Sequence, residues 1–110
     1  FSDNFDKGLS SKYRTLKAKG GFTPKVVNKR LRLTNRKHDL STAVTLDWEF
    51  PTKNNKFTLE FDYYAYGGCE DGNDYRDKSA GKWGADGLSI ILFDSSVGMN
   101  PTVGASGGSL

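Results

Sequence analysis

The sequence is poor in the residues that most often identify a function. It has one cysteine, Cys69, so an internal disulfide is excluded. Its one histidine, His38, lies beside Asp39 without a nucleophile in register, which argues against catalysis there. No apolar run approaches the ~18–20 residues of a membrane helix, and no segment has the pattern of a signal peptide. We therefore expect neither membrane insertion nor histidine-based chemistry.

Strong charge of one sign is also lacking, because the formal net charge is only +3. The exception is the segment 25–37, which has six basic residues and no acid. Nucleic-acid binding would favour aromatic residues between the cations, or a recognition helix, and the segment has neither. Arg30 and Arg32 alternate with Leu31 and Leu33, which predicts a solvated strand face and no nucleic-acid partner.

The composition favours a single β domain. The 110 residues include 13 glycines, and 13% of them are aromatic. Alternation of apolar and polar residues predicts strands. The strand at 26–34 contains a tight turn at Asn28-Lys29, and the strands at 43–50 and 57–66 form an antiparallel hairpin. The pattern of residues 8–19 is compatible with either a loop or a short strand. The predicted strands cover residues 1–6, 26–34, 43–50, 57–66 and 88–93.

The segment 88–93 is apolar apart from Ser89, which predicts a strand buried on both faces or nearly so. Such a strand needs neighbouring strands on its sides and other chain packed on both faces, and this sequence supplies too few such segments. We therefore expect residues 1–110 to be the N-terminal part of one larger β-sandwich. A second chain or a further C-terminal segment would complete it.

Two glycine-containing segments give the sequence a family resemblance. An Ala-Asp-Gly turn at residues 84–87 precedes the apolar segment, and a Gly-Gly-Ser-Leu stretch ends the segment 101–110. Residues 31–34 read Leu-Arg-Leu-Thr, and the segment 57–68 ends in Tyr-Ala-Tyr-Gly-Gly. Together these motifs resemble the L-type, legume-like lectin domains, above all those of bacterial adhesins and pilus-associated proteins.

The resemblance implies a concanavalin A-like jelly roll that binds glycan without catalysis, in a secreted or cell-surface adhesin. It implies that Asp86 accepts hydrogen bonds from two sugar hydroxyls, and that Gly107 or Gly108 donates a backbone N–H. It further implies Ca²⁺, bound mainly by residues that would follow Leu110. The alternative is that Asp86 merely caps a turn and that the two glycines belong to a linker.

The polar segment 67–84 looks like a loop insertion relative to the family pattern. In that position Tyr75 or Trp83 would stack on the sugar. The oxygen-bearing side chains of this loop also suit Ca²⁺, although their spacing is not that of an EF-hand. The alternative is a solvated acidic loop, partly neutralised by neighbouring basic residues. The candidate calcium ligands are Asp71, Asn73 and Asp74.

Two other functions use the same fold. Glu60 and Asp62 resemble part of the catalytic strand of sandwich-fold glycosidases, but Ala65 stands where the second carboxyl is needed. A hydrolase is therefore not expected. The other alternative is a structural or assembly module of a surface protein or pilus, which binds protein partners.

Overall fold

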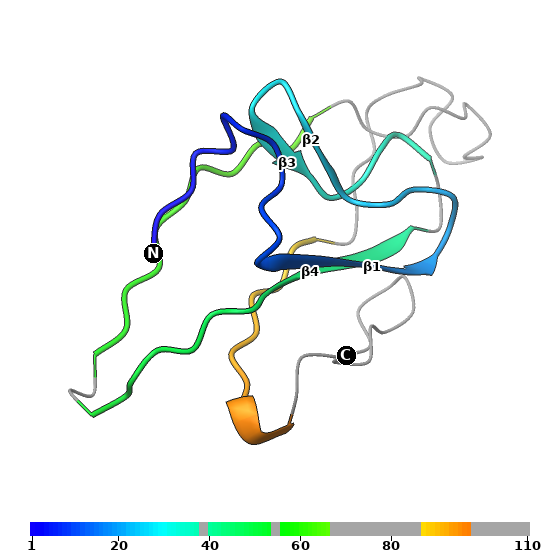
Figure 1. Ribbon diagram of the computed structural model, residues 1–110. Helices are drawn as coiled ribbons and strands as arrows, with labels where there is room; N and C mark the ends of the chain where they lie inside the picture. Colours follow the sequence, from blue (N-terminus) through cyan, green and yellow to red (C-terminus); the bar gives the residue numbers. More distant parts are fainter. Residues whose placement is uncertain (38–39, 54–55, 67–86, 98–110) are drawn as a thin grey trace.

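The protein is described by a computed structural model, which covers residues 1–37, 40–53, 56–66 and 87–97 (Figure 1). In these ranges the regular structure is strand, apart from one short 3-10 helix. The elements form two separate antiparallel sheets of two strands each, β1–β4 and β2–β3. This agrees with the predicted all-β class. The elements are β1 (Tyr13–Lys19), β2 (Lys25–Val27), β3 (Arg30–Arg32), β4 (Ser41–Leu46) and the 3-10 helix η1 (Ser95–Val97).

The larger sheet pairs β1 with β4 from Tyr13↔Leu46 to Lys17↔Thr42, and the register shifts before Lys19. One further backbone hydrogen bond, from Asp47 N–H to the Lys12 carbonyl at 2.7 Å, extends the pairing beyond the strand ends. Residues 8–19 thus contain a strand. The strand predicted at 43–50 is β4, which ends at Leu46.

The smaller sheet is a hairpin whose turn was predicted from the sequence. β2 and β3 are joined by Asn28 and Lys29 alone, and both have positive φ, 51° and 59°. Two positive φ values are the signature of a type I′ turn, whose twist matches that of the flanking strands. An asparagine at the first position tolerates this conformation well, which explains why the chain reverses there.

The buried core of the described ranges is small. Phe22 is the buried large apolar side chain of the described ranges, with 8% of its surface exposed, and Pro24, two residues later, is also buried. On β4, Thr45 is 7% exposed, and its hydroxyl donates to the Arg14 carbonyl at 3.4 Å. Phe22 and Pro24 lie in the connection from β1 to β2, whereas Thr45 pairs with Arg14 near the start of β1.

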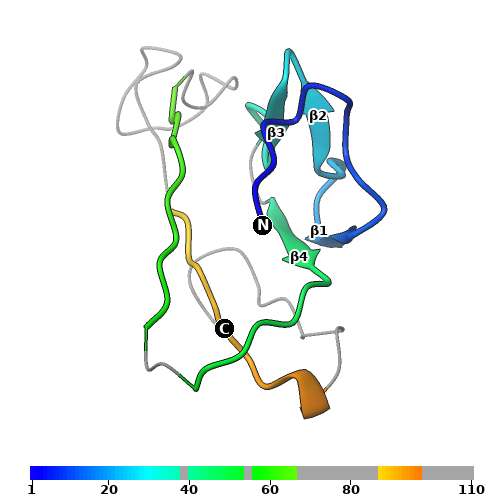
Figure 2. The same cartoon turned by 60° about the vertical axis from the view of Figure 1, so that its left-hand side comes forward.

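The predicted hairpin between residues 43–50 and 57–66 is wrong. β4 pairs with β1 instead, and residues 57–66 run as an extended trace outside both sheets (Figures 1 and 2). The alternating pattern of each segment correctly indicates extended chain. The pattern does not specify which strand each segment pairs with, because any strand with the same alternation is a possible partner.

The prediction of a buried strand at residues 88–93 is also wrong in this structure. The segment is extended but belongs to neither sheet, and its large apolar side chains are 39–58% exposed. Beyond it, the Asp94 carboxylate accepts a hydrogen bond from the Ser96 N–H at 2.8 Å and so caps η1. The same bond lowers the pKa of Asp94 below its ordinary value.

The exposed area of the whole chain is large for its size. A folded protein of 12.1 kDa is expected to expose about 6,000 Å², whereas this chain exposes 8889 Å². The radius of gyration is 15.9 Å, against about 13 Å for a compact chain of this length. The two extended apolar segments, 57–66 and 88–93, contribute to this excess because neither is covered.

Candidate functional site

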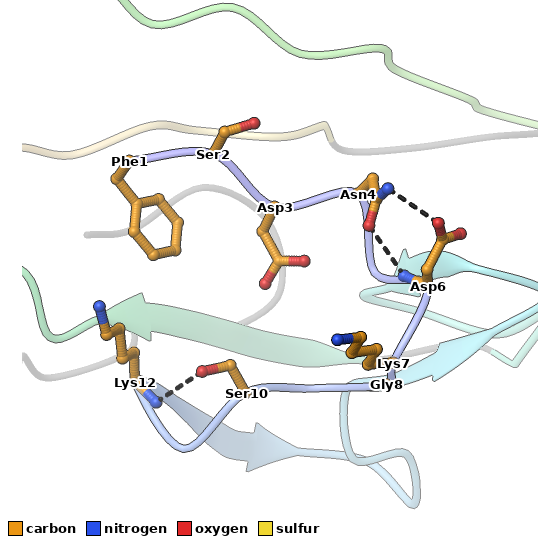
Figure 3. Close-up of a pocket in the computed structure, with 9 residues that line it drawn as sticks. All are labelled: Phe1, Ser2, Asp3, Asn4, Asp6, Lys7, Gly8, Ser10 and Lys12. Atoms are coloured by element: carbon orange, nitrogen blue, oxygen red, sulfur yellow. Dashed lines mark hydrogen bonds between the residues drawn. The ribbon is translucent and has the colours of Figure 1, made fainter.

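The N-terminal loop borders a cavity of about 390 Å³ that is widely open to solvent (Figure 3). One arm of this loop, residues 1–6, faces the other arm, residues 7–12, and polar side chains from both arms surround the space. The Asp3 carboxylate points into it, and the Phe1 ring closes one side (Figure 3). The lining residues are Phe1, Ser2, Asp3, Asn4, Asp6, Lys7, Gly8, Ser10 and Lys12.

Two consecutive side-chain-to-backbone turns shape the first arm. Asp3 Oδ1 accepts from the Phe5 N–H at 2.7 Å, and Asn4 Oδ1 accepts from the Asp6 N–H at 3.1 Å. These bonds hold Phe5 at a φ of 59°, a left-handed conformation that is uncommon for an aromatic residue. The predicted strand at residues 1–6 is therefore wrong. Asp and Asn side chains compete with strand pairing by bonding to the nearby backbone.

The carboxylates of the site are engaged by this chain's own groups. Asp6 accepts from Asn4 Nδ2 at 2.8 Å and lies 3.5 Å from Lys29 Nζ. The Tyr13 hydroxyl donates a hydrogen bond to Asp3. These contacts fasten the loop to β1 and to the β2–β3 turn. The ammonium of Lys12 lies 5.4 Å from the centre of the Phe1 ring, which leaves a cationic and aromatic edge beside the cavity.

An aromatic row leads from the cavity toward residues 57–66. Each ring lies 4.6–6.1 Å from the next, which is contact distance for aromatic pairs. Trp48 and Phe50 belong to the segment that was predicted to continue β4. They lie beyond the end of β4, and their rings belong to this row. In order, the row is Phe5, Tyr13, Phe1, Trp48, Phe50 and Phe57.

The raised pKa of Tyr13 makes the stability of the folded state depend on pH. Burial raises this pKa above its ordinary value, and the charge and hydrogen bond of Asp3 raise it further. The folded state therefore holds the phenol proton more tightly than the unfolded state. This contribution to stability is complete below the ordinary tyrosine pKa of about 10 and is lost as pH rises through the raised value.

Replacing Asp3 with Asn is expected to lower the pKa of Tyr13, but not to its ordinary value, because burial is the largest cause of the shift. The measurement is a phenolate absorbance titration, with a Tyr13→Phe variant subtracted to isolate this residue. Asp6→Asn is the matched control, since Asp6 bonds to Asn4 and Lys29. Equal shifts in the two variants would show that Asp3 has no specific effect on Tyr13.

The sequence-predicted site residues lie outside the described residues. These are the sugar contacts Asp86, Gly107, Gly108, Trp83 and Tyr75 and the candidate calcium ligands Asp71, Asn73 and Asp74. The described chain begins again at Gly87, whose φ is 146°. The N-terminal cavity was missed. The turn-forming residues Asp3, Asn4 and Asp6 were its only signal in the sequence.

No metal-binding group is visible in the described ranges, where no three His, Cys, Asp or Glu side chains come together. The Asp3 and Asp6 carboxylates accept hydrogen bonds from donors of the chain itself. No helix in these same ranges is long and apolar enough to cross a membrane. The calcium ligands proposed from the sequence therefore remain those outside the described chain.

Comparison with known proteins gave no match: no protein family, no curated protein and no solved structure is significantly similar to this chain.

Proposed function

We propose that this chain is a carbohydrate-binding, lectin-like module of a secreted or cell-surface adhesin, which binds glycan without catalysis. Its fold would be a concanavalin A-like jelly roll. In this proposal Asp86 accepts from sugar hydroxyls, Gly107 or Gly108 donates a backbone N–H, and Tyr75 or Trp83 stacks on the sugar ring. Ca²⁺ is the ion that would hold the carboxylate in position, with Asp71, Asn73 and Asp74 as candidate ligands.

The observation that supports the proposal most is the backbone at Gly87. Its φ of 146° is a conformation that side-chain-bearing residues rarely adopt, so position 87, which directly follows Asp86 in the sequence, favours glycine. An extended segment, 88–93, follows directly (Figure 2). In this proposal the constrained backbone at Gly87 holds the preceding carboxylate where it can accept hydrogen bonds from a neutral polyol.

The test is glycan-array binding by the protein, with and without calcium. Asp86→Asn is expected to weaken binding by about tenfold or more, because a charged acceptor is replaced by a neutral amide. Asp94→Asn is the matched control. Asp94 lies at the other end of the same segment, and its carboxylate is already bonded to Ser96. Equal binding by the wild type and Asp86→Asn, or an absence of glycan binding with calcium present, would refute the proposal.

A second candidate, an assembly module that binds a protein partner, is favoured by the exposed apolar segments. Leu59 and Phe61 are 51% exposed, and Ile90 is 53% exposed. Apolar surface of this extent on a soluble protein commonly marks an interaction site. Light scattering on the same preparation separates the two functions. A complex of fixed stoichiometry together with an empty glycan array would favour assembly.

A further inference from the structure

One face of the β2–β3 hairpin collects cations. Residues directly opposite each other in an antiparallel pair share a face, as do residues two apart along a strand. The pairs Lys25↔Arg32 and Val27↔Arg30 therefore present their side chains on the same side. Val26↔Leu31, the apolar pair between them, presents its side chains on the other side. Lys25, Arg30 and Arg32 thus form a group, here called the cationic face, at steps of about 6.6 Å along the strands.

The cationic face has no acidic partner of its own in the described ranges. Within these ranges, ion pairs join Arg14 to Asp47 at 3.7 Å and Lys29 to Asp6 at 3.5 Å, and none involves the three cations of the face. Lys25 and Arg30 are exposed, and Arg32 is half-buried. The hairpin is thus a concentration of positive charge in a chain whose remaining acids and bases are mixed.

Two aromatic rings orient these cations. The Arg30 guanidinium carbon lies 4.3 Å from the centre of the Tyr64 ring, and Lys25 Nζ lies 5.8 Å from that of Phe22. A guanidinium held over an aromatic ring keeps the planar fork of N–H groups that suits sulfate or carboxylate. Tyr64 itself is 55% exposed, which leaves apolar ring surface free beside the fork.

We propose that the cationic face, together with Tyr64, binds an acidic polysaccharide. The cations would contact sulfate or carboxylate groups, and the exposed part of the Tyr64 ring would contact the C–H face of a sugar. A single-stranded nucleic acid is the less suited polyanion, since its binding normally uses several aromatic platforms for successive bases. This surface uses none of the residues assigned to glycan binding above, and the inference therefore goes beyond the proposed function.

The test is binding of the protein to dextran sulfate, with neutral dextran of the same length as the reference. Wild-type protein is expected to bind the sulfated polymer only, with an affinity that falls as salt is added. The triple variant Lys25→Gln, Arg30→Gln, Arg32→Gln is expected to weaken this binding by about tenfold or more. Circular dichroism of each variant confirms that the strands persist.

A matched triple variant, Lys17→Gln, Lys53→Gln, Lys56→Gln, removes the same charge from exposed lysines elsewhere. It is expected to change the affinity by less than about threefold. If it weakens binding as much as the first variant, binding follows net charge alone and the proposal fails. Arg30→Lys, which keeps the charge and loses the fork, is expected to weaken binding severalfold. No effect of Arg30→Lys would also overturn the proposal.

Two further arms identify the ligand and separate it from the proposed function. Tighter binding of a single-stranded oligonucleotide than of dextran sulfate would assign the cationic face to nucleic acid and refute the proposal. Asp86→Asn is expected to leave dextran sulfate binding unchanged. Loss of dextran sulfate binding in Asp86→Asn would show that the cationic face is not a separate surface. The glycan-array result, by contrast, tests only the sugar site proposed at Asp86.

Discussion

Replacing Phe22 with alanine is expected to lower the free energy of unfolding by about 3 kcal/mol, the usual cost of removing a buried aromatic ring. Phe22 is the large apolar side chain that the described fold buries, at 8% exposure. It lies just before β2, and its ring contacts Lys25. Its removal would leave a cavity that few other buried apolar groups of the described ranges are placed to fill. Urea unfolding, with the m-value checked for constancy, measures the loss.

Two controls accompany the Phe22 prediction. Phe22→Leu keeps most of the apolar volume and is expected to cost about 1 kcal/mol. Phe61→Ala removes the same ring from a site that is 51% exposed, and the expected cost is below about 1 kcal/mol. A Phe61→Ala cost as large as that of Phe22→Ala would mean that residues 57–66 are covered in solution, which supports the assembly function.

Gly87→Ala is expected to destabilise the protein by about 1–3 kcal/mol through the backbone alone. A methyl group added there would meet no atom within 4 Å, so the cost does not come from crowding. It comes from the φ of 146°, which alanine rarely adopts. Because Gly87 directly follows Asp86 in the sequence, we expect weaker glycan binding, approaching that of Asp86→Asn.

Gly21→Ala provides the matched control for Gly87→Ala. Gly21 also has open space around the added methyl group, and its φ lies outside the positive range. Alanine there is expected to be neutral or to stabilise by up to about 1 kcal/mol, because it restricts the unfolded chain. Equal effects of the two substitutions, measured by thermal unfolding, would show that position 87 does not need glycine.

The β2–β3 hairpin could be predicted from the sequence because its determinants are local. Asn28 and Lys29 supply a two-residue turn, and alternation on either side supplies the strands. The pairing of β1 with β4 could not be predicted in the same way. Its partners lie some thirty residues apart, as in Arg14↔Thr45, and period-2 patterns do not specify which strands meet.

The apolar segments show a different limit of sequence reasoning. The patterns of residues 57–66 and 88–93 correctly predict extended chain with one or two apolar faces. Whether those faces are buried depends on other chain packing against them, which no local pattern encodes. Both segments are accordingly extended and uncovered in the structure.

The N-terminal site was mispredicted because short polar side chains override a weak alternation. Phe1, Asp3 and Phe5 share one parity, which favoured a strand. The hydrogen bonds of Asp3 and Asn4 to the backbone two residues onward turn the chain instead. The sugar site proposed at Asp86 rests on its motif and on the neighbouring glycine, since Asp86 itself lies outside the described residues.

The order of the strands has a kinetic consequence. The β2–β3 hairpin lies within the connection between β1 and β4, from Lys19 to Ser41. A hairpin with a two-residue turn closes within about 1–10 μs and draws together the ends of that connection. The loop that must then close to align β1 with β4 is effectively shorter, which reduces its entropic cost. The small hairpin is therefore expected to form first and to speed the pairing of the larger sheet around it.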